Sequence, residues 1–374
     1  MLPIERGISS MKTGFAASIP RLQRLLPRFR KIRVAVLGDL MLDRYLSGTA
    51  HRISPEAAVP VVDFVSQNDC LGGAGNVAAN LAALGAPVQA FGFVGGRKIA
   101  GSKIADDEAG AALRACLRQA KIADRGVLPD PLRITTVKTR IVARHQQIAR
   151  IDRERRDAPT PEAEEKLFRL LVAALKKLDA LLLSDYDKGL LTDAFAERIL
   201  NACHKFKVPV FVKPKTSSLF AYRGARAIVC NTKEAGFYVT RSLNDEKSIE
   251  EAGRALLARF GCAAVVITRG EKGMSIFEET SPRHLHIPAT SFELTYARVG
   301  RPGTERSDTG RQVFDVTGAG DTVLTVLSLA IAAGATLPEA AFLANTAAGV
   351  VVGKLGTASV SPAELAAALD EIHL

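Results

Sequence analysis

Short apolar runs alternate with longer segments of helical period between residues 161 and 268, and this alternation constrains the fold more than any other feature. Buried strands are predicted at 180–183, 208–212, 227–230 and 263–268, and helices at 161–177, 192–206, 233–238 and 247–260. A further β-rich run at 32–37 precedes Gly38-Asp39. Because strands joined by helices run parallel, the sequence predicts an α/β fold: a doubly wound, mostly parallel sheet flanked by helices.

Two other segments have the period of strands and lie outside this pattern. Residues 45–66 alternate weakly and contain two prolines, which favours edge strands, whereas residues 134–152 alternate more clearly. Two β pieces inside a chain of alternating strands and helices predict a second, small sheet. We expect it to form a lid from strands at about 43–66 and 133–152.

The N-terminal residues 1–32 carry several Arg and Lys broken by Gly, Ser and Pro. We expect a flexible basic lead-in there, followed by one domain at 33–374. Four apolar residues of the lead-in fall at helical spacing and predict one docked helix: Leu22, Leu25, Leu26 and Phe29.

A glycine-rich turn near the C-terminus is the strongest candidate for a functional site. The segment 314–321 reads Phe-Asp-Val-Thr-Gly-Ala-Gly-Asp, begins as a short apolar strand, and precedes an apolar helix at 322–333. The N–H groups of residues 318–320 would face a ligand at the positive end of the helix dipole, which favours an anion. Asp321 beside such a site fits a group that takes a proton from an alcohol. The alternative is a carboxylate that only stabilises the helix N-terminus.

Carboxylates also follow the first predicted strand. Asp39 lies directly after it, where ligands of an open α/β sheet bind, and Asp43 follows four residues later. Carboxylates accept hydrogen bonds from hydroxyl groups, so the pair indicates a polyhydroxylated substrate. The alternative is that Asp39 only caps the turn.

A second glycine-rich segment at 71–76 opens a predicted helix at 77–84. Its spacing, Gly73-x-Gly75-x-x-Ala78, also matches the dinucleotide-binding fingerprint. That match is weak, because the preceding residues do not read as a clear strand and no acidic residue follows at the expected distance. A nicotinamide oxidoreductase is therefore a distant alternative.

The segment 315–321 resembles the signature of the ribokinase-like (PfkB) sugar kinases. Four other segments resemble the branch of that family that phosphorylates D-glycero-β-D-manno-heptose 7-phosphate: 38–45, 52–57, 72–78 and 350–357. The resemblance runs from about Arg33 to the C-terminus, with insertions near 96–105 and 295–311 that read as loops. It implies an ATP-dependent kinase that phosphorylates the anomeric hydroxyl to give the 1,7-bisphosphate, in ADP-heptose and lipopolysaccharide core biosynthesis.

The resemblance assigns roles to particular residues. The signature's last Asp is the family's catalytic base and the preceding amides form its anion hole, which here are Asp321 and Gly318, Ala319 and Gly320. Sugar contacts are expected from Asp39, Asp43, Gly72, Gly73 and Asn76. Cations for the sugar's own phosphate are expected among Arg52, Arg140, Arg150 and Lys188. The small sheet is implied to close over the sugar and to form the contact of a homodimer.

The nucleotide side follows from a second family element. Residues 231–234, Asn-Thr-Lys-Glu, resemble the family's Asn-x-x-Glu, whose Glu holds Mg²⁺ through water, here Glu234. The alternative is a helix start that Thr232 caps. Nucleotide contacts are implied for Asn231, Glu234, Thr268, Gly270, Gly273 and Asn345. The implied cofactors are ATP and Mg²⁺, and a monovalent cation is left open.

One position departs from the family. Residues 213–215 read Lys-Pro-Lys where the family has Asp-Pro-Lys, so Lys213 replaces an acid. The added charge can strengthen phosphate binding, shift nucleotide preference or disable a water network. Two alternatives therefore stay open: another ribokinase-like sugar or nucleoside kinase, and a sugar-phosphate sensor that has lost turnover.

Composition limits the classes of partner and the cellular compartments that we expect for this chain. The formal charge of +11 suggests anionic partners, but the chain has no Trp and only 6% aromatic residues, which argues against single-stranded nucleic acid. Five scattered cysteines without a Cys-x-x-Cys pair fit a reducing compartment. No apolar run approaches the roughly 20 residues of a spanning helix, so we expect a cytoplasmic protein with no membrane partner.

Overall fold

The fold was analysed in a computed structural model that describes residues 18–99, 104–143, 146–215, 222–290, 318–354 and 358–372. The predicted strand before the glycine-rich turn, at 313–316, lies outside the described residues, as do the whole loop at 295–311 and residues 1–17 of the lead-in. No helix in the described ranges is both long and apolar enough to cross a bilayer.

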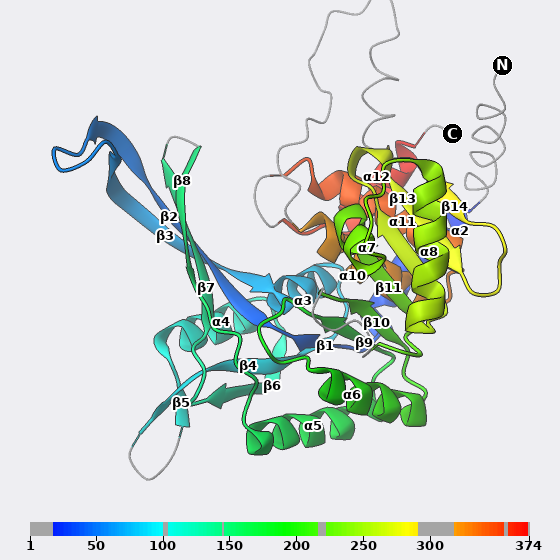
Figure 1. Ribbon diagram of the computed structural model, residues 1–374, viewed down its shortest axis with the longest axis horizontal. Coiled ribbons are helices and arrows are strands. Elements are labelled where there is room, and N and C mark those ends of the chain that lie inside the picture. The colour runs from blue at the N-terminus through cyan, green and yellow to red at the C-terminus, as the bar shows by residue number, and fades with distance from the viewer. Residues whose placement is uncertain are drawn as a thin grey trace, which may run out of the picture.

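A ten-stranded sheet forms the centre of the molecule (Figure 1). Its main path runs β14-β13-β12-β11-β10-β9-β1-β4-β5, and β6 also pairs with β4. The strands are β1 (Val34–Gly38), β4 (Val88–Lys98), β5 (Ile104–Asp106), β6 (Ala123–Asp130), β9 (Ala180–Ser184), β10 (Val210–Lys213), β11 (Ala227–Asn231), β12 (Ala264–Thr268), β13 (Met274–Glu278) and β14 (Leu285–Ile287). Strands β6, β4, β1, β9, β10, β11 and β12 run parallel, and β13, β14 and β5 are antiparallel additions.

Helices cover both faces of this sheet, as the alternating pattern predicts. One apolar core contains side chains of α2 (Ile19–Leu25), η1 (Leu26–Lys31), α3 (Ala74–Ala83), α4 (Glu108–Gln119), α10 (Ala319–Ala332), α11 (Leu337–Val351) and α12 (Pro362–Asp370). The other contains side chains of α5 (Pro161–Leu175), α6 (Asp193–Phe206), α7 (Thr232–Tyr238) and α8 (Glu246–Phe260). A short 3-10 turn, η3 (Gly270–Lys272), follows β12. The doubly wound α/β prediction is confirmed.

The predicted small sheet is also present, and its order is β3-β2-β7-β8. Its strands are β2 (Leu40–Ile53), β3 (Pro60–Gly73), β7 (Thr136–Ala143) and β8 (Gln146–Arg153). Because a single residue, Asp39, separates the end of β1 from the start of β2, the small sheet leaves the large one at Asp39. Figure 1 shows its far half projecting from the body as an arm.

Three local predictions differ from the structure. β2 lies between β3 and β7 and is an interior strand of the small sheet, although its weak alternation read as an edge. Residues 67–70 belong to β3, although they did not read as a strand. Residues 96–98 pair with β5 as a hairpin and are not a loop, because β4 continues past the point where its apolar run ends.

The described part of the lead-in packs firmly. Leu22 and Phe29 are fully buried, and Leu25 and Leu26 nearly so, in the core beneath α10 and α12. The helical spacing of these four residues is thus confirmed as a docked helical segment.

Candidate active site

Asp39 lies where β1 ends and the small sheet begins. Its side-chain oxygen Oδ2 accepts hydrogen bonds from the backbone N–H groups of Tyr186 (2.9 Å) and Lys188 (3.1 Å), both in the loop after β9. The other oxygen, Oδ1, is buried and has no hydrogen-bond partner within the described part of the chain. A buried acceptor without a donor is unusual in a folded protein, so Oδ1 is suited to receive a hydrogen bond from a ligand.

Burial sets the proton affinity of this carboxyl. It is 4% exposed, and loss of water together with the neighbouring Asp185 raises the pKa of Asp39 to about 6. The two backbone N–H groups and Arg133 act in the opposite direction. Asp39 is therefore mostly ionised at neutral pH, and a modest fall in pH protonates it.

Asp321 lies in the first turn of α10, after Gly318 at φ +85°, a conformation that favours glycine. The carboxyl is 4% exposed. Its Oδ2 accepts from Asn76 Nδ2 at 2.8 Å, and its Oδ1 accepts from the Tyr186 hydroxyl at 2.8 Å and from Lys213 Nζ at 2.5 Å. Three donors from three different elements thus converge on this one carboxylate.

Tyr186 joins the two carboxylates. Its backbone N–H donates to Asp39 and its hydroxyl donates to Asp321. Burial and the Asp321 charge raise the pKa of Tyr186 well above its usual value, so the hydroxyl remains a donor. One residue therefore fixes Asp39 and Asp321 relative to each other.

Asn76 is held in place from the helix that carries it. The chain enters α3 through Gly73 at φ +56°, and the N–H of Ala74 donates to the Asp39 carbonyl oxygen at 3.0 Å. Asn80, one turn later, donates to the Asn76 side-chain oxygen at 3.2 Å. Asn76 Nδ2 is thereby turned toward Asp321, and the structure brings these two predicted site residues together.

The second predicted sugar-side carboxylate is paired with a predicted phosphate-binding cation. Arg140 Nη1 on β7 lies 2.9 Å from Asp43 Oδ1 on β2. Gly72 on β3 leaves room for this carboxylate, because a Cβ there would lie 2.8 Å from Asp43 Oδ2. Lys188 is paired too, with Glu154 at 2.9 Å.

The other two predicted cations lie apart from this group. The side chain of Arg52 is 69% exposed and lies 3.9 Å from Asp63 on the projecting arm. The side chain of Arg150 is 52% exposed and is paired with Asp152 at 2.9 Å. Neither touches a residue that contacts Asp39 or Asp321 in the described structure.

Two of the predicted nucleotide residues, Asn231 and Glu234, form a capping box at the start of α7. The Asn231 side chain accepts from the Glu234 N–H at 2.8 Å, and Glu234 Oε2 accepts from the Asn231 N–H at 3.0 Å. The cap is thus Asn231, and the alternative of a Thr232 cap is wrong, because the Thr232 hydroxyl donates to the Thr268 carbonyl instead. The remaining oxygen of Glu234 lies 2.8 Å from Lys215 Nζ.

The remaining predicted nucleotide residues lie at the end of β12, in the turn that follows it, and in the middle of α11. Gly270 and Gly273 have φ of +60° and +80°, a conformation that favours glycine, and a Cβ at Gly273 would lie 2.0 Å from the Ile287 carbonyl oxygen. Thr268 ends β12, and its hydroxyl donates to the Cys230 carbonyl at 3.4 Å. The Asn345 side chain on α11 donates to the Pro288 carbonyl at 2.7 Å.

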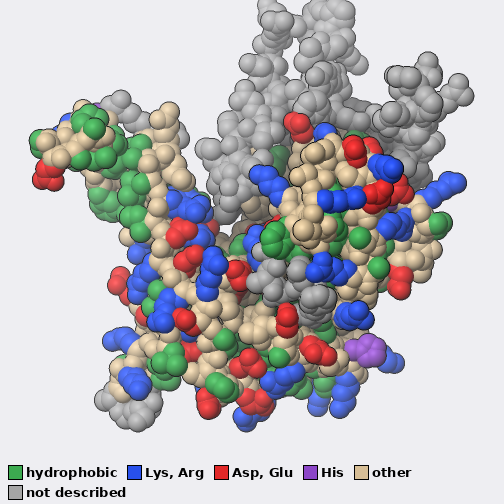
Figure 2. All heavy atoms as spheres, viewed as in Figure 1, with side chains coloured by type: hydrophobic (Ala, Val, Ile, Leu, Met, Phe, Trp, Pro, Cys, Tyr) green, Lys and Arg blue, Asp and Glu red, His purple; other side chains and the backbone are tan. Residues whose placement is uncertain are grey.

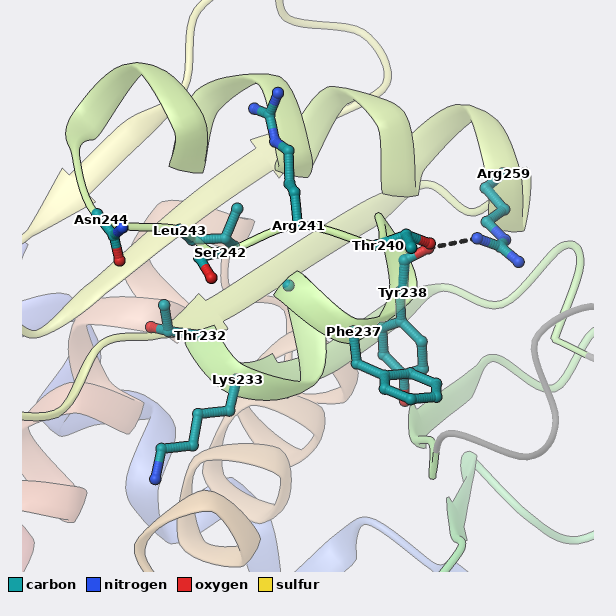
Figure 3. Close-up of a pocket in the computed structure, with 11 residues that line it drawn as sticks. Thr232, Lys233, Phe237, Tyr238, Thr240, Arg241, Ser242, Leu243, Asn244 and Arg259 are labelled. Atoms are coloured by element: carbon teal, nitrogen blue, oxygen red, sulfur yellow. Dashed lines mark hydrogen bonds between the residues drawn. The ribbon is translucent and has the colours of Figure 1, made fainter.

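Sequence reasoning missed Tyr186 and Lys215 and did not foresee the partner of Lys213. The signal for Tyr186 was its position in the polar loop directly after β9, beside the loop that carries Asp39. An open groove of about 730 Å³ along α7, lined by Lys233, Phe237 and Arg241 among others, contains none of the predicted site residues (Figure 3).

Solved structures share this architecture. An Arabidopsis thaliana ribokinase complexed with ribose and ATP superposes with a TM-score of 0.65 over 90% of this chain and 98% of that chain, at 16% identity. Phosphofructokinase-2 from Escherichia coli superposes with a TM-score of 0.67 over 91% of this chain and 99% of that chain, at 18% identity. The fold is therefore ribokinase-like, with a large, mostly parallel sheet flanked by helices and a separate small sheet.

The sequence comparisons add the family. The pfkB family carbohydrate kinase model matches residues 31–364, so the chain belongs to that family. It is therefore a phosphotransferase whose acceptor is a hydroxyl group of a sugar. The bifunctional protein HldE of Geotalea uraniireducens is 43% identical over 94% of the chain, and that of Geobacter sulfurreducens is 44% identical over 91%. The chain spans 66% and 64% of the length of these two relatives.

Proposed function

We propose that this chain transfers the γ-phosphoryl group of ATP to the anomeric hydroxyl of D-glycero-β-D-manno-heptose 7-phosphate, in the supply of ADP-heptose for lipopolysaccharide core. The relatives named HldE support this substrate, and the family supports the reaction class. The observation that carries the proposal is the reaction centre that Asn76, Tyr186 and Asp39 build around Asp321.

The chemistry assigns different tasks to the two carboxylates. Asp321 takes the proton of the anomeric hydroxyl as its oxygen attacks the γ-phosphorus. The N–H groups of Gly318, Ala319 and Gly320, at the start of α10, stabilise the charge on the transferring group. Asp39 Oδ1 accepts a hydrogen bond from a sugar hydroxyl, and Asn76 orients the sugar beside it.

The rest of the substrate falls between the two sheets. Asp43, Gly72 and Gly73 border the sugar, and Arg140 and Lys188 are the cations that bind the 7-phosphate. Arg52 and Arg150 can contribute only if the projecting arm folds inward. Closure of the small sheet as a lid would exclude water and prevent hydrolysis of ATP.

The nucleotide is proposed to lie against Asn231, Thr268, the turn from Gly270 to Gly273, and Asn345. Glu234 is the residue that would hold Mg²⁺ through water, since carboxylate oxygens suit this ion, and its Oε1 lies 2.8 Å from Lys215 Nζ. Mg²⁺ would neutralise charge on the β- and γ-phosphates.

The apolar arm supports a homodimer formed through the small sheet. Four large apolar side chains near its tip are more than half exposed: Ile53 (65%), Val59 (53%), Phe64 (65%) and Val65 (68%). Figure 2 shows hydrophobic side chains gathered on this projecting arm. An apolar patch of this kind is typical of a protein–protein contact. We place the dimer in the cytoplasm.

The test is product analysis by mass spectrometry after incubation with ATP, Mg²⁺ and the heptose 7-phosphate. The expected product is the heptose 1,7-bisphosphate, which carries the new phosphate at the anomeric position. A parallel panel of fructose, ribose, tagatose 6-phosphate and nucleosides identifies another kinase specificity, and preference for any of these would overturn the heptose assignment.

One observation favours a second candidate, a sugar-phosphate sensor without turnover. Lys213 forms an ion pair with the proposed base, and such a pair can hold the base in an inactive state. Tight ATP binding without product over several hours would favour the sensor.

A further inference from the structure

Lys213 ends β10, and its side chain reaches across to the start of α10. Its Nζ lies 2.5 Å from Asp321 Oδ1 and 5.4 Å from the centre of the Tyr186 ring. The side chain is 16% exposed. A Cβ on Gly320 would lie 3.4 Å from the same Nζ, so the ammonium borders the backbone of the glycine-rich turn.

The ammonium is charged despite its burial. Burial alone would lower the pKa of Lys213, but the Asp321 carboxylate and the Tyr186 hydroxyl outweigh it and hold the pKa above its usual value. Within the described ranges Asp321 is the one carboxylate within ion-pair distance of Lys213. An ammonium group has three N–H donors, so it can bind a second acceptor without giving up its charge.

The pair leaves Asp321 poorly prepared to act as a base. Its two oxygens already accept from Lys213, Tyr186 and Asn76. A carboxylate that receives an ammonium hydrogen bond is less able to take a proton from an alcohol. A γ-phosphoryl group at the turn beside Gly320 would offer the ammonium a more highly charged acceptor, a few ångströms from its present one.

We propose that Lys213 is a catalytic residue of the phosphoryl transfer, whose ammonium leaves Asp321 for the oxygens of the γ-phosphoryl group when ATP occupies the cleft. The proposal rests on the proposed kinase function. Before ATP binds, Lys213 blocks the base, and in the complex it neutralises the transferring group. ATP binding thereby releases the base only when the phosphoryl group is present.

The atoms of the step balance without a further reactant. The anomeric O–H bond breaks and its proton goes to Asp321, while the oxygen forms a bond to the γ-phosphorus. The bond from the γ-phosphorus to the β–γ bridging oxygen breaks, and its electron pair leaves with ADP. Lys213 keeps its proton throughout and only changes its hydrogen-bond partner.

Substitution of the ammonium by a side chain of similar length tests the proposal. Lys213→Met should lower kcat by about 100-fold, as loss of one charge-stabilising donor does, and change the KM for the sugar by less than about threefold. Lys213→Arg should recover part of kcat, because it restores the charge. Lys205→Met, an exposed Lys→Met change on α6, is the matched control and should behave as wild type.

Binding provides a readout apart from turnover. ADP with aluminium fluoride imitates the transferring group, and calorimetry compares its affinity with that of ADP alone. Lys213→Met should weaken the fluoride complex by about the same factor as kcat and leave ADP affinity nearly unchanged. Since the single variant leaves a buried carboxylate unpaired, Lys213→Met/Asp321→Asn should be compared with Asp321→Asn as well, and it should show the same selective loss.

Two results would overturn the proposal. A Lys213→Met enzyme with wild-type or higher kcat would show that the ion pair is inhibitory or structural. Equal affinity for the fluoride complex with and without Lys213 would show that its ammonium does not contact the transferring phosphoryl group. Failure of the kinase function has a different signature, because wild-type protein would then form no bisphosphate, whereas the fluoride comparison would still report on Lys213.

Discussion

Asp39 and Asp321 are both 4% exposed, yet the protein surrounds them in opposite ways. Asp39 is held on one oxygen by two backbone N–H groups, and its other oxygen has no partner among the described residues. Asp321 receives three side-chain donors, one of them an ammonium. Backbone N–H groups thus hold the first carboxylate, whereas side chains hold the second.

This difference supports the two tasks that we propose for the two carboxylates. A rigid carboxylate with a free acceptor is suited to bind and orient a hydroxyl. A carboxylate held by exchangeable side chains is suited to be released for proton transfer when a ligand displaces a partner. Tyr186 contacts both carboxylates, so a single residue sets the position of Asp39 relative to Asp321.

The largest effect is expected at Asp321. Asp321→Asn retains the shape of the side chain and removes its ability to take a proton, so kcat should fall by about 1,000-fold or more. ATP affinity, measured by calorimetry, should change little, because we propose that other residues bind the nucleotide. Near-normal turnover in Asp321→Asn would contradict the assignment of Asp321 as the base and of Asp39 as the binding carboxylate.

A smaller loss with a different signature is expected at Asp39. Asp39→Asn should raise the KM for the sugar and lower kcat/KM by about 100-fold, since a hydrogen bond to a charged acceptor is replaced by a weaker one. Steady-state kinetics at varied sugar concentration measures this. A fall in kcat with unchanged KM would assign Asp39 to the chemical step.

The same residue should control the acid limb of the pH profile. Because the folded-state pKa of Asp39 is about 6, above the usual 3.8, kcat/KM should fall as pH drops through 6 and the carboxylate is protonated. Folding favours the protonated form, so ionisation between pH 4 and 6 costs about 3 kcal/mol of stability. Asp39→Asn should therefore be at least as stable as wild type at pH 7. The kcat/KM of this variant should no longer fall as pH drops through 6. An unchanged limb in the variant would assign it to another group.

Removal of the bridge between the carboxylates should have an intermediate effect. Tyr186→Phe deletes one hydrogen bond to Asp321 and keeps the backbone N–H that Asp39 uses. We expect kcat to fall by about tenfold, equivalent to one hydrogen bond, with the KM for the sugar nearly unchanged. A larger effect on KM than on kcat would show that the hydroxyl serves the sugar.

The smallest effect on chemistry is expected far from both carboxylates. Phe64→Ser/Val65→Ser on the projecting arm should convert a dimer to monomer in analytical ultracentrifugation and change kcat by less than about threefold, because hydrophobic anchors dominate such interfaces. Phe237→Ser in the groove along α7 is a matched exposed control and should leave the oligomer unchanged. A wild-type monomer would contradict the proposed contact.

The parts of the fold that followed from the sequence are those with strong local patterns. The α10 helix is largely apolar and is buried from Asp321 to Ala330, and the strands β9 and β12 are short, mostly apolar runs, so local sequence pattern identified them. β2 was misplaced as an edge strand, because its partners β3 and β7 are set by tertiary pairing and its own alternation is weak.

The site divides in the same way. The glycine-rich turn and its Asp321 are adjacent in sequence and could be recognised together. The ion pair of Lys213 with Asp321 joins residues 108 positions apart, and no local pattern encodes that contact. The capping box of Asn231 and Glu234 has the spacing of a helix start, and the structure shows that both side chains serve that local purpose.

Single-turnover phosphoryl transfer in a quench-flow instrument, at saturating ATP and sugar, tests most directly whether the two carboxylates have separate tasks. Under these conditions a binding defect is masked and only the chemical step is seen. Asp39→Asn should transfer the phosphoryl group within about tenfold of the wild-type rate, and Asp321→Asn at least about 1,000-fold more slowly. Equal rates in the two variants would contradict the account.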